Sequence, residues 1–110
     1  MKRIEAKEVV KILESAISGA EKVIVRDPNY AFSKDLSQFK CEIGSYLFSF
    51  FVDAGELDYV DEVKCRDGRF SDFDYWTEFS EYKKDPLEFL RDDQIQKLKQ
   101  IFSNVSKNQS

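Results

Sequence analysis

The chain has 110 residues, of which 42% are hydrophobic, 15% aromatic and 35% charged, and its net charge at pH 7 is −4. This length and composition predict one α+β domain spanning residues 1–110 with its own apolar core. The acidic balance argues against a general binder of nucleic acid or of anionic membranes, because both need a basic surface. The sequence also contains no histidine, so the commonest general base and metal ligand is missing.

The N-terminal part predicts a helix followed by a strand. Apolar residues recur every three or four positions through residues 5–18, which is the pattern of an amphipathic helix, and Gly19 fits its C-terminal stop. The segment Lys22–Arg26 is short and β-branched, and Asp27-Pro28 ends it with residues typical of a turn.

A β-hairpin is predicted next, because residues 37–43 alternate between apolar and polar side chains and Gly44-Ser45 fits a two-residue loop before residues 46–52. This loop sets a register in which the apolar residues of both strands share one face. The predicted pairs are Ile43 with Tyr46, Cys41 with Phe48, and Phe39 with Phe50. On the other face Leu47 and Phe51 are left for another element or for a partner.

A third strand of the meander is expected to follow a turn around Gly55 and to end at Cys65, before Asp67-Gly68. Its register against the preceding strand stays open. From Ser71 onward, aromatic residues recur every three positions and predict a helix with a core-facing stripe, in which Ser71 and Asp74 form a capping pair. The stripe consists of Phe73, Trp76, Phe79 and Tyr82.

The C-terminal part predicts helices. Asp85-Pro86-Leu87-Glu88 combines an N-cap Asp, a Pro at the first helical position and a Glu three residues after the cap. A final amphipathic helix is expected from about Asp93 to Asn104, with residues 106–110 as a frayed tail. The fold class is thus α+β, with an N-terminal helix, an antiparallel meander of three to four strands and C-terminal helices packed on one face.

The two cysteines, Cys41 and Cys65, lie at apolar strand positions, which favours buried free thiols, with a single disulfide as the alternative. Zinc is not expected, because two cysteines without histidine do not complete a tetrahedral site. Charged residues interrupt the N-terminal apolar pattern and no apolar run is long enough to span a bilayer. These features predict a cytoplasmic protein without a cofactor.

One segment stands out by its charge. Residues 53–81 contain ten acidic and three basic side chains, and Tyr59, Tyr75 and Trp76 lie among them. Carboxylates attract and pair with Lys and Arg, while large aromatic side chains are the usual anchors of protein interfaces. The residues predicted to contact a partner are Asp53, Glu56, Asp58, Tyr59, Asp61, Glu62, Asp67, Asp72, Asp74 and Trp76.

Short motifs give a resemblance as well. Through Gly55-Glu56-Leu57-Asp58-Tyr59, Asp67-Gly68-Arg69, Trp76 and Asp85-Pro86-Leu87, the chain resembles a family of small bacterial domains without an assigned function, over roughly residues 44–101. The resemblance implies no catalytic residue. By size, acidity and lack of catalytic groups, the chain also looks like the immunity proteins that bacteria encode beside secreted or contact-delivered toxins, which implies tight binding of one cognate toxin, often a basic nuclease.

These observations lead to a functional hypothesis and two alternatives. The first is an immunity protein that neutralises a cognate toxin, as in contact-dependent growth inhibition, through the segment 53–81. The second is a generic interaction module, with a homodimer formed through Leu47, Phe51 and the edge strand. The third is an enzyme that uses carboxylates or a divalent ion, although the carboxylates match no calcium-loop spacing and the sequence shows no recognisable catalytic constellation. A non-enzymatic binding protein is therefore the expectation.

Overall fold

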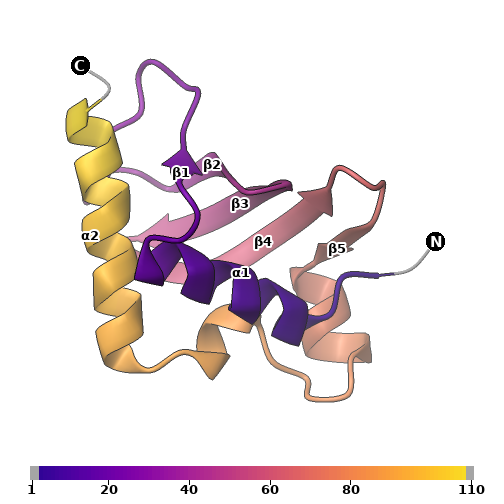
Figure 1. Cartoon of the computed structure of the whole chain (residues 1–110). Coiled ribbons are helices and arrows are strands. Elements are labelled where there is room, and N and C mark those ends of the chain that lie inside the picture. The colour runs from indigo at the N-terminus through magenta and orange to yellow at the C-terminus, as the bar shows by residue number, and fades with distance from the viewer. Residues whose placement is uncertain (1–2, 109–110) are drawn as a thin grey trace.

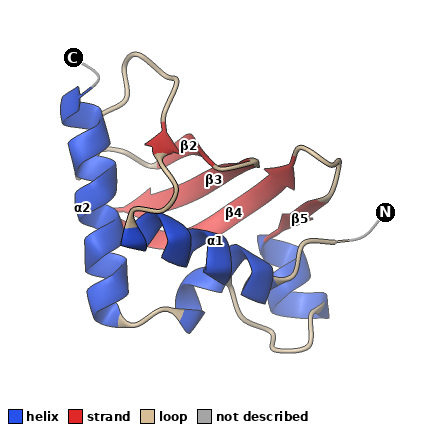
Figure 2. Ribbon diagram, in the orientation of Figure 1, coloured by secondary structure: helices blue, strands red, loops and turns tan. Residues whose placement is uncertain are grey.

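The computed structural model describes residues 3–108, which form an antiparallel sheet with helices on one side (Figures 1 and 2). Helix α1 covers Ala6–Ser18 and helix α2 covers Asp92–Asn108. The strands are β1 (Val23–Ile24), β2 (Gln38–Ile43), β3 (Tyr46–Asp53), β4 (Glu56–Cys65) and β5 (Phe70–Asp72). A π-helical turn, η1 (Tyr75–Phe79), and a 3-10 turn, η2 (Pro86–Phe89), lie between β5 and α2.

The five strands lie in the order β1-β2-β3-β4-β5, each antiparallel to its neighbours. The meander is therefore confirmed, but the expected three to four strands are too few. The additional strand is β5, which occupies residues where the sequence predicted the start of a helix. The first predicted strand is also shorter than expected, since pairing ends at Ile24 rather than at Arg26.

The predicted hairpin register is confirmed, because β2 pairs with β3 through Ile43–Tyr46, Cys41–Phe48 and Phe39–Phe50. Gly44 adopts a φ of 60° in the connecting turn, a conformation that glycine adopts without steric cost. The paired apolar residues face the helices, where the Phe102 ring of α2 lies 5.0 Å from the ring of Phe39 and 5.2 Å from that of Phe50. The core thus lies between the sheet and the two helices.

The aromatic segment differs most from expectation. Ser71 is a strand residue, and its hydroxyl accepts a hydrogen bond from the backbone N–H of Ile4 at 2.7 Å. The predicted capping pair of Ser71 and Asp74 is therefore wrong; instead Asp72 Oδ1 accepts from the N–H of Tyr75 at 2.9 Å. The predicted core stripe is broken as well, since Trp76 is fully buried whereas Phe79 is 74% exposed.

The predicted capping box at Asp85 and Glu88 is present, but it begins the short turn η2. After η2 the chain extends through Leu90, and α2 begins only at Asp92. Helical backbone continues to Asn108, so α2 is longer than the helix expected to end near Asn104, and residues 109–110 lie outside the described part of the chain. Neither α1 nor α2 combines the length and apolar character needed to cross a bilayer.

Candidate functional site

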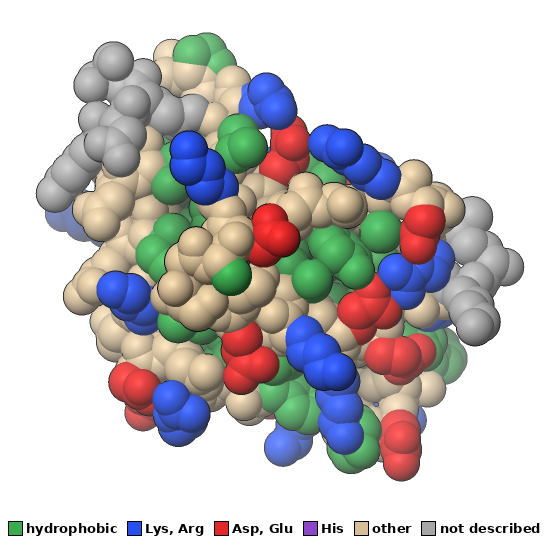
Figure 3. Space-filling view, viewed as in Figure 1, with side chains coloured by type: hydrophobic (Ala, Val, Ile, Leu, Met, Phe, Trp, Pro, Cys, Tyr) green, Lys and Arg blue, Asp and Glu red, His purple; other side chains and the backbone are tan. Residues whose placement is uncertain are grey.

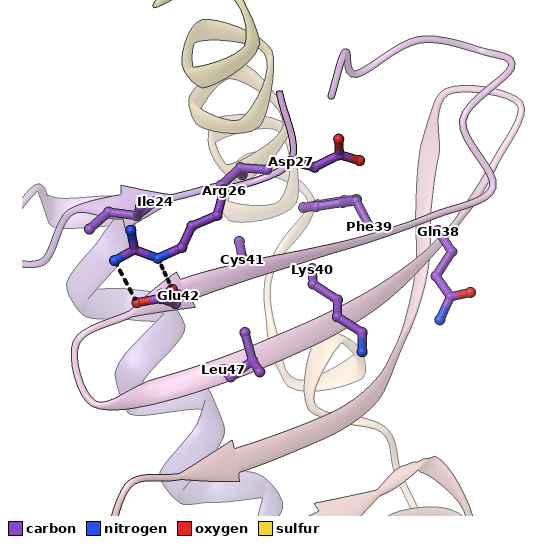
Figure 4. A pocket seen from close by; sticks show the side chains of 10 residues that line it. Ile24, Arg26, Asp27, Gln38, Phe39, Lys40, Cys41, Glu42 and Leu47 are labelled. Carbon is purple, nitrogen blue, oxygen red and sulfur yellow. Dashed lines mark hydrogen bonds and ion pairs between the residues drawn. The ribbon is translucent and has the colours of Figure 1, made fainter. Parts of the chain in front are cut away.

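The face of the sheet turned away from α1 and α2 carries the candidate site. On β3 this face presents Leu47, Ser49 and Phe51, while Phe48 and Phe50 between them are fully buried against the helices. Figure 4 views part of this face, with Leu47 in front of the strands and the helices behind them. We call this surface the open face.

Three aromatic rings form a row across the open face, one each from β3, from β4 and from the residue after β5. The ring centroids of Phe51 and Tyr59 are 4.8 Å apart, and those of Tyr59 and Phe73 are 4.3 Å apart. All three side chains are half-buried. Tilted contacts at such distances stabilise aromatic pairs, so the three rings form one continuous aromatic row.

Two bulges in β4 place carboxylates beside this row. The β3–β4 register shifts between Ser49 and Phe50 and again between Phe51 and Val52. Each shift leaves one extra residue in β4, Asp61 at the first and Asp58 at the second. Bulges of this kind redirect side chains and increase the local twist of a strand, and here each extra residue is an acid.

The carboxylates of β4 and β5 crowd one another. Glu62 lies directly opposite Asp72 in the β4–β5 ladder, and like charges in this position are unfavourable. A shallow cavity of about 150 Å³ beside them is lined by Tyr59, Asp61, Asp72, Phe73 and Asp74. We call the three rings of the row together with Asp61, Glu62, Asp72 and Asp74 the acidic–aromatic site.

The pKa of Asp61 reports this crowding. It lies above its ordinary value because the side chain is partly desolvated and because Glu62, Asp72 and Asp74 repel its charge; Lys40 acts in the opposite direction. Lys64 Nζ lies 4.0 Å from Glu62, at the limit of an ion pair. The carboxylates are therefore only partly neutralised within the chain, and an approaching cation would relieve their repulsion.

Half of the predicted contact residues belong to this site. Tyr59, Asp61, Glu62, Asp72 and Asp74 come together on the open face. Asp58 sits next to Tyr59 and is close enough to help raise its pKa, after desolvation and Asp61. The fold therefore brings half of the predicted residues together, and their role in binding stays a prediction.

Three other predicted residues lie elsewhere. Asp53 and Glu56 flank the β3–β4 turn, where Glu56 pairs with Lys99 of α2 at 2.7 Å. Asp67 pairs with Arg69 at 2.7 Å, and the Arg69 guanidinium donates two further hydrogen bonds of 2.8 Å to the carboxylate of Glu8 in α1. Glu56 and Asp67 are thus paired with basic side chains within the chain, whereas Asp53 is exposed at the turn.

The prediction for Trp76 needs correction. Its side chain is 0% exposed, and its indole N–H donates to the carbonyl of Ile4 at 2.9 Å. It is an internal anchor for the N-terminal segment and is not available as a surface contact. Phe51 and Phe73 take the aromatic role instead. The alternation of residues 46–52 already placed Phe51 outside the core, but Phe73 was missed because it was assigned to a core-facing stripe.

The arrangement suits the binding of cationic side chains. Carboxylates accept charge-assisted hydrogen bonds from Arg and Lys, and aromatic faces attract the same cations. Among residues 3–108 no group of three or more Asp, Glu or Cys side chains is placed to hold a metal ion. Both cysteines are free, and burial raises the pKa of the Cys41 thiol.

The side of the molecule covered by α1 looks different. There, basic and acidic side chains are intermingled over the helix and the adjoining turns (Figure 3). The unbalanced group of carboxylates is thus a feature of the strands β4 and β5 and of the residues that follow them.

Comparison with known proteins gives a family but no activity. No curated protein and no solved structure matches the chain. A family model described as a domain of unknown function, DUF7693, matches residues 3–104, a wider span than the resemblance over residues 44–101. The chain therefore belongs to the DUF7693 family.

Proposed function

We propose that this chain is a binding protein whose acidic–aromatic site engages a basic protein, and that it acts as an immunity protein against a cognate toxin. The observation that carries the proposal is the row of Phe51, Tyr59 and Phe73 on the open face, bordered by four carboxylates that the chain neutralises only in part. A basic nuclease is the kind of toxin that such a site would fit, and nucleic acid or a membrane is not an expected partner.

Repulsion among the carboxylates of the site destabilises the free chain and would be relieved by a cationic partner. Glu62 and Asp72 are paired in register, and Asp61 is adjacent, so their mutual repulsion is present before binding. Lys or Arg side chains placed among them would remove this repulsion and form charge-assisted hydrogen bonds. The aromatic row would supply rigid apolar contact area, as aromatic anchors do at protein interfaces.

The charge distribution also favours rapid association. Ten of the chain's twenty-one acidic residues fall within residues 53–81, against three of its seventeen basic ones. Such asymmetry steers a basic partner and raises its association rate by orders of magnitude at low salt. A strong dependence of the association rate on salt is therefore an expected property of the complex.

The first experiment is a pull-down of the tagged chain from a lysate of its own organism at low and at high salt, with bound proteins identified by mass. The test variant is Asp61→Lys with Asp74→Lys, which reverses two charges at the site. The control is Glu14→Lys with Glu21→Lys, which makes the same change in net charge at two exposed positions on and just after α1.

We expect one basic partner that the wild type and the control capture and that the test variant loses. With that partner purified, the affinity of the test variant should fall at least about tenfold, and its association rate should depend less on salt. Equal affinity of the wild type and the test variant would show that the acidic–aromatic site is not the interface.

A homodimeric interaction module is the second candidate, because Leu47 is 38% exposed on the open face. Light scattering over a range of concentrations separates the two candidates. A mass that rises with concentration, and that Leu47→Ser returns to the monomer value, would favour the dimer, whereas a constant monomer mass would argue against it.

A further inference from the structure

The outer edge of β2 is largely unpaired. Strand β1 has two residues, and its ladder with β2 consists of Val23–Ile43 and Ile24–Glu42. Strand β2 continues to Gln38, so in the part of the chain that the structure describes no strand pairs with its outer side from Gln38 to Cys41. This edge lies on the side of β2 turned away from β5, while on its other side Gln38 and Lys40 pair with Phe51 and Ser49 of β3.

The backbone groups at this edge point outward at alternate residues. Ser37 bonds toward β3, because its carbonyl accepts a hydrogen bond from the N–H of Val52 at 2.9 Å. In an antiparallel ladder the next bonding pairs on the same side are two and four residues further along, which assigns Phe39 and Cys41 to β3. The N–H and carbonyl groups of Gln38 and Lys40 therefore face outward.

The sequence explains why β1 stops early. Continuing the ladder for two more residues would place Arg26 directly opposite Lys40, and like charges across a ladder are destabilising. Arg26 instead forms an ion pair with Glu42. Pro28 then follows, and proline cannot donate a hydrogen bond to a sheet. The charge of Arg26 and the proline at position 28 therefore end the pairing after Ile24, which leaves the edge of β2 without a neighbouring strand.

A groove of about 620 Å³ runs along this edge between residues 24–27 and β2 (Figure 4). Its apolar lining includes Ile24 and Leu47, which are 42% and 38% exposed. The volume is within the range of known peptide and ligand sites. The groove therefore offers apolar contact next to unpaired backbone donors and acceptors, as in domains that bind a peptide by adding it to a sheet.

The charges in the groove indicate what kind of segment fits. Arg26 and Glu42 neutralise each other, whereas Lys40, as far as the structure describes the chain, forms no ion pair. An acidic residue opposite Lys40 would be favoured. A second copy of β2 fits less well, because pairing two such edges brings both Lys40 side chains onto one face within a short distance. Edge lysines commonly act against self-association in this way.

We infer that the edge of β2 from Gln38 to Cys41 binds an extended segment of a partner protein as an added strand, with an Asp or Glu of that segment opposite Lys40. This edge adjoins the acidic–aromatic site through the pair Gln38–Phe51, but the inference does not depend on the function of that site.

The probe is a displayed library of random dodecapeptides, selected on the wild-type chain. The key variant is Lys40→Pro, which removes an outward N–H without removing a bond to β3. Lys40→Ala keeps the N–H and removes only the charge. The variant Asp74→Lys serves as the control, because it changes the acidic–aromatic site.

We expect enriched peptides that alternate apolar residues with at least one acidic residue. Their affinity should fall at least about tenfold in Lys40→Pro and less in Lys40→Ala, and should not fall in the control. Bound peptide should also protect the amides of Gln38 and Lys40 of the wild type from hydrogen exchange. Because hydrogen exchange is measured on the wild type, it tests strand addition at this edge even if Lys40→Pro does not fold.

Three results would overturn the inference. They are the absence of any peptide enriched over a blank surface, unchanged exchange at the amides of Gln38 and Lys40 with bound peptide, and a concentration-dependent dimer that Lys40→Pro abolishes. The last result would assign the edge to a second copy of the chain. Failure of the acidic–aromatic site in its own test would leave these outcomes unchanged.

Discussion

The buried carboxyl of Asp85 makes the stability of this protein depend on pH. Its side chain is 2% exposed, and its two oxygens accept hydrogen bonds of 3.0 Å from the N–H groups of Val60 and Leu87. These bonds join β4 to η2. Burial acts more strongly than both hydrogen bonds and raises the pKa of Asp85 to about 7.

This pKa has a definite consequence for folding. In the unfolded chain the pKa returns to the ordinary value of 3.8, so the folded protein holds the proton more tightly. The associated stability is complete below a pH of about 4 and is lost as the pH rises through 7. The difference between the two pKa values corresponds to about 4 kcal/mol of unfolding free energy.

The test compares the wild type with Asp85→Asn in urea unfolding between about pH 4.5 and 8.5. Asparagine stays neutral, although its amide cannot accept both backbone hydrogen bonds, so the variant is expected to start about 1–3 kcal/mol less stable. The difference in unfolding free energy should shrink as the pH rises. Only the wild type loses stability, because its unfolded state releases the Asp85 proton at a lower pH than its folded state does. Other carboxyl groups, such as Glu8, whose pKa Arg69 lowers, are present in both proteins. Their contributions to the pH dependence therefore cancel in the difference between the two unfolding free energies.

The opposite trend would refute this reasoning. If the wild type gains stability relative to Asp85→Asn as the pH rises, then the two backbone N–H groups outweigh burial and Asp85 is ionised in the folded state. Titration of the Asp85 carboxyl carbon by NMR gives the same answer independently, since the expected midpoint near 7 is far from that of an exposed aspartate.

Three further predictions concern single side chains and are measured by urea unfolding. Arg69→Met should cost about 1–3 kcal/mol, because it leaves the half-buried Glu8 carboxylate without its paired guanidinium; a change below about 0.5 kcal/mol would contradict this. Phe79→Ser should change the unfolding free energy by no more than about 0.5 kcal/mol, because Phe79 is 74% exposed. Trp76→Phe should lower it by about 1–3 kcal/mol, because the hydrogen bond to the N-terminal segment is lost. Equal effects of the two substitutions would support the predicted core stripe after all. Gly44→Ala should cost about 1 kcal/mol, since its φ of 60° disfavours a side chain, and an unchanged midpoint would mean that the turn relaxes freely.

The parts of the fold that the sequence predicted are those determined by neighbouring residues. The β2–β3 register follows from Gly44-Ser45 and from the alternation on either side, all within about fifteen residues. The capping box at Asp85 and Glu88 is local too. In both cases short-range hydrogen bonding and side-chain alternation determine the structure, so no knowledge of distant contacts was needed.

The region after Cys65 was predicted less well because distant residues determine it. Ser71 and Trp76 both bond to the backbone of Ile4, about seventy positions earlier in the chain. These contacts favour strand pairing at Ser71 over the helix that the spacing of the aromatics suggests. A three-residue spacing describes one face of a helix, but tertiary contacts override such a preference.

The same limit applies to the acidic–aromatic site. The density of carboxylates in residues 53–81 indicated an acidic surface, but the register of β4 could not be predicted from the residues. Without it, the bulges at Asp58 and Asp61 could not be located, and acids that face the open side could not be separated from Glu56 or Asp67, which pair with basic residues.

The arrangement of Glu62 and Asp72 is difficult to explain by folding alone. A sheet is stabilised when opposite charges, or aromatic and β-branched residues, face each other across a ladder. Here two acids are paired in register, a third is inserted by a bulge, and the only nearby basic group of β4 lies at the limit of ion pairing. Lys40, two strands away on β2, lowers the pKa of Asp61, but desolvation and the neighbouring acids outweigh it. A surface that retains this repulsion next to half-buried aromatic rings is better suited to a cationic partner than to the stability of the free chain.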